Sequence, residues 1–245
     1  MIFQGILGST KSTILQRFTF KQLKARPNSG FWLIEKNDKL EIEFAENWNN
    51  VVIDFIKIFT LLRSGRTKPY SNPLKNALGK SAKSVIDLSC GMGVDAVNML
   101  FFGHKIVALE RDPLIYCLLW DALERAKQDS NYGSLFEQGF SLFHVDAKDF
   151  LTTENCQNRT IYYDPMFVEQ DKKKSLSSKQ MQFISYCVGA DTDQEDVINL
   201  CLDSAAKWLI IKRPDKVKRS GHRPIEIFSG KTICFEKYAC KAEKI

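Results

Sequence analysis

The residues with the most evident chemical potential form the stretch YYDPMF at positions 162–167, directly after an apolar run. The carboxylate of Asp164, with a neighbouring backbone carbonyl, could accept hydrogen bonds from the exocyclic amine of a nucleobase and hold its nitrogen in line for attack. Phe167 could stack on a base turned out of its helix, and Pro165 would keep the turn rigid. A strand-ending turn in which Asp164 caps a helix is the alternative that this hexapeptide alone leaves open.

A glycine-rich loop lies upstream, in the stretch VIDLSCGMGVDA at positions 85–96. Gly91 and Gly93 allow the backbone to approach a ligand closely, and the N-terminus of the following helix offers unpaired N–H donors. The loop therefore predicts a nucleotide-like ligand. Because Gly91, Gly93 and Ala96 also fit the G-x-G-x-x-A dinucleotide pattern, S-adenosylmethionine (SAM) and NAD are both candidates, and a purely structural turn is the third.

Two acids in this region favour SAM over NAD. Asp87 lies four residues before Gly91, and Asp95 lies in the first turn of the next predicted helix. Carboxylates suit the cationic sulfonium and amino groups of SAM, whereas they repel a pyrophosphate. Glu110, at the end of the next strand, is placed to accept hydrogen bonds from the ribose hydroxyls that both cofactors carry.

Asp146 follows a further predicted strand and could bind the adenine amino group. As a single residue it fits equally well as the N-cap of the following helix. Its position favours a binding role, because it is the third consecutive strand end to carry a polar group on one edge. Ligands of open α/β sheets bind at that edge.

The elements that must position these residues alternate between short β-rich runs and helical patterns from residue 84 onward. This rhythm is typical of a doubly wound, Rossmann-like α/β domain with a mostly parallel sheet, which we expect to span residues 81–245. We predict strands at residues 84–88, 105–109, 140–145, 160–163 and 208–212, and helices at about residues 93–102, 113–127, 175–186 and 194–207. Residues 225–228 and 232–238 flank a Ser-Gly-Lys turn and predict a closing antiparallel hairpin.

The first 80 residues follow a different rhythm and are expected to form a small N-terminal α+β extension with a linker. Residues 31–34 and 40–44 flank the polar turn KNDK and predict a hairpin, and residues 51–55 predict a further strand. A basic linker at residues 63–69, punctuated by glycine and proline, precedes a short predicted helix that ends near Gly79.

The composition is that of a globular protein. Of the 245 residues, 44% are apolar and 26% charged, which allows a substantial core. No apolar stretch approaches the roughly 20 residues of a membrane span, and the N-terminus lacks the pattern of a secretory signal, so we expect a cytoplasmic protein without a membrane segment. The seven cysteines form no CxxC pair and only three histidines are present, which predicts reduced structural thiols and no metal. The absence of heptads predicts a monomer.

The net charge of +6 is unevenly distributed. One basic group contains Lys172, Lys173, Lys174 and Lys179, and another contains Lys212, Arg213, Lys216, Lys218, Arg219, His222 and Arg223. Such groups suit a polyanion, although an isolated charge run is more often a solvated surface. Because both groups follow predicted strands on the edge that carries the candidate site, we predict that they guide an RNA backbone.

Taken together, these motifs resemble the RsmJ-type guanine-N2 methyltransferases of small-subunit ribosomal RNA. The similarity runs from about residue 40 to the C-terminus and is clearest from residue 84. It is carried by DPMF at 164–167, QDKKKSL at 170–176, KQMQF at 179–183, VGADTD at 188–193, LERDP at 109–113, KRP at 212–214 and GHR at 221–223.

The resemblance implies SAM-dependent methylation of the exocyclic N2 of a guanosine near the 3′ end of bacterial 16S ribosomal RNA, with that RNA or a ribosomal particle as the partner. The cofactor contacts that it implies are Val94, Asp95, Glu110, Arg111, Asp146, Ala147 and Asp164. Where the family has an arginine and a small hydroxyl residue, this chain has Val94 and Ala147, which would contribute only backbone or packing contacts.

Three other functions fit parts of the pattern. A methyltransferase acting on adenine N6 or on a protein glutamine would use a similar turn at Asp164. An NAD(P)-dependent oxidoreductase would use the same glycine-rich loop, although no Tyr-x-x-x-Lys or histidine dyad accompanies it. A non-catalytic RNA-binding or assembly protein would keep the fold without needing the carboxylate of Asp164.

Overall fold

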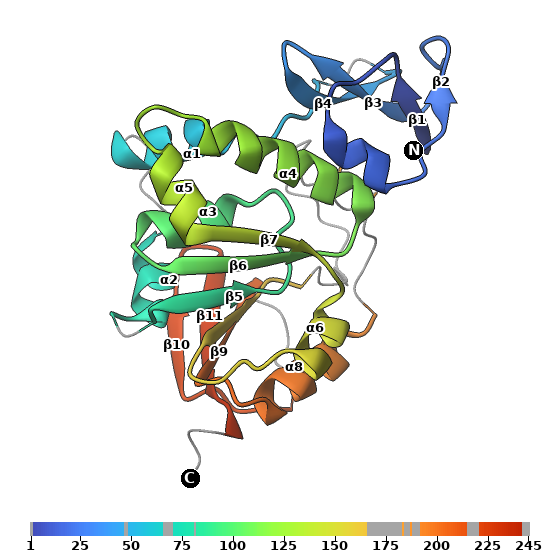
Figure 1. The fold of residues 1–245 in the computed structure, drawn as a ribbon. Coiled ribbons are helices and arrows are strands. Elements are labelled where there is room, and N and C mark those ends of the chain that lie inside the picture. Colours follow the sequence, from blue (N-terminus) through green and yellow to red (C-terminus); the bar gives the residue numbers. More distant parts are fainter. Residues whose placement is uncertain are drawn as a thin grey trace.

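The fold contains two β-sheets of unequal size (Figure 1). The computed structural model describes residues 2–46, 49–65, 71–80, 82–165, 183, 187, 192–214 and 221–241. The large sheet has seven strands in the order β10-β11-β9-β8-β5-β6-β7, and the small sheet has four in the order β2-β1-β3-β4. No helix within the described ranges is long and apolar enough to cross a membrane.

The large sheet confirms the predicted doubly wound α/β fold with a C-terminal hairpin. Its strands are β5 (Ser84–Asp87), β6 (Lys105–Glu110), β7 (Phe140–His144), β8 (Thr160–Tyr163), β9 (Trp208–Pro214), β10 (Glu226–Ser229) and β11 (Ile233–Ala239). Strands β5 to β9 are parallel, and β11 pairs antiparallel with both β9 and β10. From β5 the chain builds outward to β6 and β7, then returns to β8 on the other side. The order therefore reverses between β5 and β8, where open α/β sheets bind their ligands.

Helices cover both faces of this sheet, and each face has its own apolar core. They are α1 (Phe55–Arg63), α2 (Ser71–Leu78), α3 (Val94–Phe101), α4 (Pro113–Lys127), α5 (Gly133–Gly139), α6 (Ala147–Thr153) and α8 (Gln194–Asp203). Figure 1 shows α4 and α5 on one side of the sheet and α6 and α8 on the other. The predicted helix at 194–207 ends early, because Ser204 caps it by donating its hydroxyl to the carbonyl of Cys201.

The N-terminal extension is built on the small sheet and a single 3-10 helix. Its elements are β1 (Phe3–Leu7), η1 (Thr13–Arg17), β2 (Gln22–Leu23), β3 (Phe31–Lys36) and β4 (Lys39–Phe44). The predicted hairpin is confirmed, because β3 and β4 pair antiparallel. Its two turn residues, Asn37 and Asp38, adopt φ angles of 51° and 55°, as a tight hairpin turn requires.

The predicted strand at residues 51–55 is wrong. Only Val51 makes a β-bridge, to Ile42, and helix α1 begins at Phe55. The helix forms because the side chain of Asp54 caps it by accepting a hydrogen bond from the backbone N–H of Lys57. Phe55, Phe59 and Leu62 then fall on one buried face at helical spacing.

The division of the chain at residue 80 stays a prediction. Helices α1 and α2 pack on α3 and on the C-terminal hairpin, respectively, so they belong to the layers of the large sheet. One cluster of buried side chains runs from Ile6 in β1 through Phe55 in α1 to Phe235 in β11. The packing of α1 and α2 on the layers of the large sheet favours a boundary before α1.

The predicted helix at 175–186 lies outside the described residues, apart from Phe183, which packs between Phe31 and Phe44.

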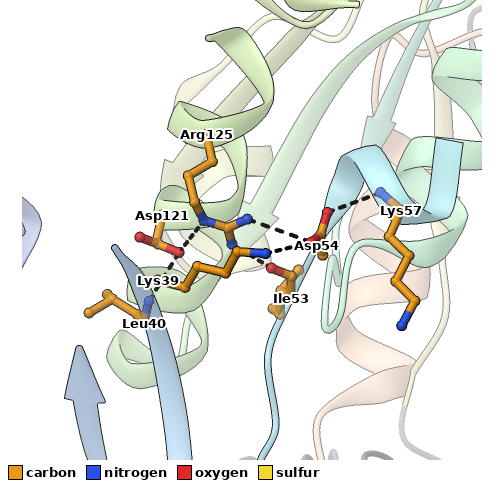
Figure 2. A network of polar contacts seen from close by, with 7 residues as sticks. All are labelled: Lys39, Leu40, Ile53, Asp54, Lys57, Asp121 and Arg125. Carbon is orange, nitrogen blue, oxygen red and sulfur yellow. Dashed lines mark hydrogen bonds and ion pairs between the residues drawn. The ribbon is translucent and has the colours of Figure 1, made fainter. Parts of the chain in front are cut away.

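A polar network fixes the extension to α4 (Figure 2). Arg125 donates from Nε to Asp121 at 2.9 Å and from Nη2 to the carbonyl of Ile53 at 2.6 Å. The same Asp121 carboxylate accepts the backbone N–H of Leu40 in β4 at 3.3 Å. Lys39, at the start of β4, pairs with Asp54 at 3.1 Å. One guanidinium group therefore links α4 with the segment that enters α1 and, through Asp121, with β4.

We expect Arg125→Met to lower the free energy of unfolding by about 2 kcal/mol, because it removes charge-assisted hydrogen bonds and leaves a half-buried carboxylate without its cation. Urea denaturation measures this loss. Lys127→Met is the matched control on the same helix. Its ion pair with Glu124 at 2.9 Å joins neighbouring turns, and its second partner, the exposed Glu137 in α5, is distant at 3.8 Å, so we expect a loss of only about 0.5 kcal/mol. Equal losses for the two variants would contradict the linking role of Arg125.

Candidate active site

A cavity of about 290 Å³ opens at the carboxyl ends of the parallel strands, where the strand order reverses. Its lining comes from β5 and the loop after it, from the ends of β6, β8 and β9, and from the first residues of α6 and α8. The lining residues are Asp87, Leu88, Ser89, Cys90, Gly91, Met92, Val94, Asp95, Leu109, Glu110, Arg111, Asp146, Ala147, Tyr162, Tyr163, Asp164, Asp193, Val197 and Lys212. The structure thus brings together the predicted strand-end acids in one place.

Lys212 lies at the centre of the acidic groups. Its ammonium donates to Asp95 Oδ2 and to Asp164 Oδ2, each at 2.8 Å. Tyr162 donates its hydroxyl to the same Asp95 oxygen at 2.7 Å. The register of the sheet explains the arrangement: Tyr163 in β8 is paired with Ile211 in β9, so the next residues, Asp164 and Lys212, lie side by side.

Burial by itself would lower the pKa of Lys212, but the carboxylates of Asp95 and Asp164 outweigh it and raise that pKa well above its usual value. Lys212 is therefore a cation at every physiological pH. It was predicted to contact an RNA backbone. The structure instead directs it into the cavity, where it holds two carboxylates.

Two of the carboxyl groups are almost completely buried. Burial raises the pKa of Asp87 to about 8, assisted by the charges of Asp95 and Asp164, although the Asp87 carboxylate accepts the backbone N–H of Ser89 at 3.1 Å. Burial likewise raises the pKa of Glu110 to about 7. Both groups therefore carry protons over part of the neutral range when no cation lies beside them.

Glu110 is held by the two loops that flank it. One oxygen accepts the backbone N–H of Gly91 at 3.0 Å and the other accepts that of Asp112 at 2.8 Å. Asp112 in turn caps α4, accepting hydrogen bonds from the N–H groups of Leu114 and Ile115, each at 2.9 Å. The carboxylate of Glu110 is thus fixed at the end of β6, where a ribose is expected.

Asp146 is the N-cap of α6, as one of its two predicted roles requires. Its Oδ1 caps α6 by accepting the backbone N–H of Lys148 at 2.8 Å, while Oδ2 lies 3.6 Å from Arg111 Nη1. Arg111 also reaches Asp193 at 3.8 Å, across the cavity from β6 to the start of α8. Asp146 and Ala147 line the cavity, and an adenine contact by Asp146 stays a prediction.

Gly93 was predicted to contact the cofactor and does not line the cavity, unlike its neighbours Gly91, Met92 and Val94. It adopts φ 72°, and a Cβ there would lie 2.6 Å from Phe55 Cε1. The glycine is therefore required by a left-handed turn and by close packing of α1, rather than by a ligand. From the sequence, Gly93 was assigned a ligand contact, whereas its role is to allow the close contact with α1.

The prediction that Arg213 contacts RNA is wrong for the structure as described. The side chain is only 4% exposed, and its Nε donates to the fully buried Glu236 at 2.8 Å. Tyr238 donates its hydroxyl to the same carboxylate at 2.6 Å. In a strand, neighbouring side chains point to opposite faces. Because Lys212 faces the cavity, Arg213 enters the core on the other face.

The remaining predicted RNA contacts are only partly described. His222 is half-buried and lies 2.9 Å from the side-chain oxygen of Asn199, and Arg223 is exposed. Phe167, Lys172, Lys173, Lys174 and Lys179 lie outside the described residues. Pro165 is buried directly after Asp164. The roles predicted for all of these residues stay predictions.

Sequence reasoning missed three contributors to the site. Tyr162, which was predicted only as part of a strand, donates its hydroxyl to Asp95. Ser89 accepts the backbone N–H of Asp164 at 2.9 Å, and Asp193 pairs with Lys148 at 2.7 Å. The position of Lys212 beside Asp164 was predictable, because it follows from the parallel register of β8 and β9. No such signal identifies Ser89, because the contact joins residues 75 positions apart in the sequence.

The chemistry of the lining suits a cationic ligand. Six carboxyl groups and two cationic side chains, Arg111 and Lys212, face the cavity. A positive charge beside Asp87 and Glu110, the two most buried acids, would add to the backbone hydrogen bonds that favour their ionised forms. A pyrophosphate is an anion, and the carboxylates of the cavity would repel it. Within the described part of the chain, no three or more His, Cys, Asp or Glu side chains are arranged so that they could hold a metal ion.

Comparison with known proteins agrees with this geometry. The family of putative SAM-dependent methyltransferases matches residues 14–240. The Ribosomal RNA small subunit methyltransferase J of Chromobacterium violaceum is 28% identical over 240 residues, which cover 95% of this chain and 93% of that protein. The protein of the same name from Hydrogenovibrio crunogenus is 34% identical over 205 residues, which cover 82% and 74%.

The fold is also found among solved structures. A SAM-dependent methyltransferase from Neisseria gonorrhoeae superimposes with a TM-score of 0.73 at 20% identity, covering 96% of this chain and 95% of that one. This likeness extends over both sheets and confirms the fold class. The chain therefore belongs to the family of SAM-dependent methyltransferases, together with the proteins named Ribosomal RNA small subunit methyltransferase J.

Proposed function

We propose that this protein transfers a methyl group from SAM to the exocyclic N2 of a guanosine near the 3′ end of 16S ribosomal RNA. The relatives named Ribosomal RNA small subunit methyltransferase J support the RNA substrate. The observation that carries the proposal is the position of Asp164. Its carboxylate lies at the end of β8 on the wall of the cavity, held by Lys212 and, through its backbone, by Ser89.

The cavity fits the cofactor that the family uses. SAM supplies a methyl group already activated on a sulfonium, so the chain needs to bind and orient rather than to activate. Glu110 would accept hydrogen bonds from the ribose hydroxyls, and Asp146 would accept one from the adenine amine. Asp87 and Asp95 would face the cationic groups of the methionine portion, for which their negative charges are suited.

Asp164 would hold the attacking nitrogen. Lys212 donates to one oxygen of this carboxylate at 2.8 Å, and an ionised carboxylate is purely an acceptor with lone pairs on both oxygens. It can therefore accept hydrogen bonds from the guanine amine while it remains paired with Lys212. Holding the amine in this way draws its lone pair out of conjugation with the ring and directs it at the methyl carbon.

The group transfer then needs no strong base. A bond forms between N2 and the methyl carbon as the carbon–sulfur bond breaks and its electron pair stays on sulfur. The nitrogen becomes cationic and loses one proton to water. Asp164 stabilises that developing positive charge, and Lys212 restrains the carboxylate so that it keeps its orientation.

Of the alternatives, the oxidoreductase does not fit the family to which the chain belongs. A methyltransferase that modifies another amine or amide remains the relevant rival, because the same carboxylate would orient adenine N6 or a glutamine amide equally well. Product identity separates these possibilities.

We expect small-subunit RNA from cells lacking this protein to lose one N2-methylguanosine near its 3′ end, as measured by mass spectrometry of nuclease fragments. Purified protein with labelled SAM should restore that modification on the unmodified RNA or ribosomal particle. A labelled product other than N2-methylguanosine would reject the proposed specificity. No transfer to either form of the substrate would reject the RNA assignment.

Asp164→Asn should lower kcat by about 10²–10³-fold, because the amide keeps the size of the side chain but loses the charge that stabilises the cationic nitrogen. Asp164→Ala should abolish almost all activity, with SAM binding weakened but retained. Single-turnover methyl transfer and calorimetric titration with SAM measure the two effects separately. Asp203→Asn is the matched control, because Asp203 is exposed and its ion-pair partner in the described part of the chain is Lys241 on the surface. Full activity of Asp164→Asn would show that the carboxylate has no catalytic role.

SAM binding should release protons and strengthen as pH rises. The pKa values of about 8 for Asp87 and about 7 for Glu110 lie above the ordinary range of carboxyl groups, so both bind protons near neutral pH without a ligand. A bound cation favours their ionised forms. The affinity for SAM should therefore increase about tenfold or more between pH 6 and 7.5.

S-adenosylhomocysteine is the control ligand for this measurement. It carries the same amino-acid and nucleoside groups without the positive sulfur, so its affinity should depend less on pH. Calorimetry in buffers with different heats of ionisation counts the protons released. An equal pH dependence for the two ligands would show that the buried acids do not sense the sulfonium.

A further inference from the structure

The net positive charge of the chain is concentrated at the start of the N-terminal extension. Its first 34 residues contain five cationic side chains and no acid, whereas the whole chain has a net charge of +6. These side chains are Lys11, Arg17, Lys21, Lys24 and Arg26, and all of them are exposed. The remaining 211 residues are therefore close to neutral.

The small sheet separates these cations from the acids of the extension. Acidic residues begin with Glu35 and lie on β3, β4 and the turn between them, while Lys21 and Lys24 flank β2 at the opposite edge. Lys11 and Arg26 have ion-pair partners in Asp38 and Glu43. Among the residues that the structure describes, Lys21 and Lys24 have none. Their charges are thus directed at solvent.

The segment that leads into this basic edge contacts the rim of the active-site cavity through Phe18. Phe18 packs edge-on against His144 with ring centroids 4.9 Å apart, and Tyr116 lies 5.0 Å from the same imidazole. His144 Nε2 in turn lies 3.1 Å from the carbonyl oxygen of Arg111, which lines the cavity. Figure 1 shows the extension beside the first turns of α4, at the carboxyl end of the strands.

A hollow of about 190 Å³ lies on the same edge. Its walls include the rings of Phe18 and Phe20 and the polar side chains of Ser12, Gln16 and Gln22. The hydroxyl oxygen of Ser12 is buried without a hydrogen-bond partner among the described residues. Aromatic rings beside amide and hydroxyl groups are the means by which proteins hold an unstacked base.

We propose that residues 11–26 form a second RNA-binding surface, which holds a single-stranded segment of the substrate next to the target guanosine. Lys21 and Lys24 contact its phosphates, and one unstacked base enters the hollow beside Phe18 and Phe20. This inference rests on the proposed function, since it assumes an RNA substrate. It assigns to the extension the task of positioning the RNA, apart from methyl transfer itself.

The test is the double variant Lys21→Glu/Lys24→Glu, assayed by steady-state methylation of small-subunit RNA. We expect KM for the RNA to rise about tenfold or more, while kcat and the Kd for SAM stay unchanged. The slope of log Kd for RNA against log salt should fall by about one to two, as expected for the loss of two phosphate contacts. Ultraviolet crosslinking should attach the RNA to the peptide that contains Phe18 and Phe20.

The matched control is Lys83→Glu/Lys105→Glu, which makes the same change in net charge. Both of these lysines are exposed and lie at the amino ends of β5 and β6, on the edge of the sheet away from the cavity. The control should retain the KM of the unaltered protein. Thermal unfolding of both double variants shows whether either change disturbs the fold.

The outcomes separate this inference from the proposed function. If the unaltered protein and both double variants methylate the RNA with the same KM and salt dependence, the surface is not used and the proposed function stands. If both double variants raise KM equally, the effect is one of net charge and the surface assignment fails. If the unaltered protein binds RNA through Lys21 and Lys24 without methylating it, the surface stands and the proposed function fails.

Discussion

The ammonium group of Lys212 is the interaction on which the candidate site depends. The carboxyl groups of Asp87, Asp95 and Asp164 converge on the wall of the cavity, and like charges placed so close would otherwise protonate or move apart. One cation bound to two of them removes that conflict. The position of Lys212 is itself fixed by contacts on the opposite face of the sheet. The buried Arg213–Glu236 pair ties β9 to β11 on the other face, so the strand that carries Lys212 has little freedom to shift.

The electrostatic design separates two kinds of partner within one small molecule. The cavity gathers acids and suits a cationic cofactor, whereas the cations of the extension lie at an exposed edge and suit a polyanion. Arg111 stands between the two regions, pairing with Asp146 and Asp193 at the rim. For an RNA substrate, this separation would keep the phosphates away from the acids that suit the cofactor. It also explains why the overall charge of the chain says little about the charge at the site.

The sequence determines most of the fold through its periodicities, and the exceptions have identifiable causes. The parallel strands and their order of acids were predictable because each strand is short, apolar and followed by a polar turn. Residues 51–55 were predicted as a strand from their apolar content, but only Val51 makes a β-bridge, and the capping carboxylate of Asp54 starts a helix at Phe55. In the site, Lys212 and Arg213 looked like one basic patch. Because neighbouring side chains of a strand point to opposite faces, the two residues lie on different sides of the sheet, and a count of charges along the sequence does not show this. Contacts such as Asp164 with Ser89 depend on distant segments and have no local signal.

The close packing of Phe55 against Gly93 has a consequence for how this chain could be divided. The loop that lines the cavity takes its left-handed turn at the point where the ring of Phe55 fills the space beside it. Phe55 belongs to α1, ahead of the first strand of the large sheet. Its ring stacks on Phe136 in α5 and lies tilted against Phe140 in β7. A fragment that began at the large sheet would lack Phe55, the side chain that packs against the loop at Gly93. The smallest unit able to bind the cofactor therefore includes α1, and the catalytic domain is larger than its sheet.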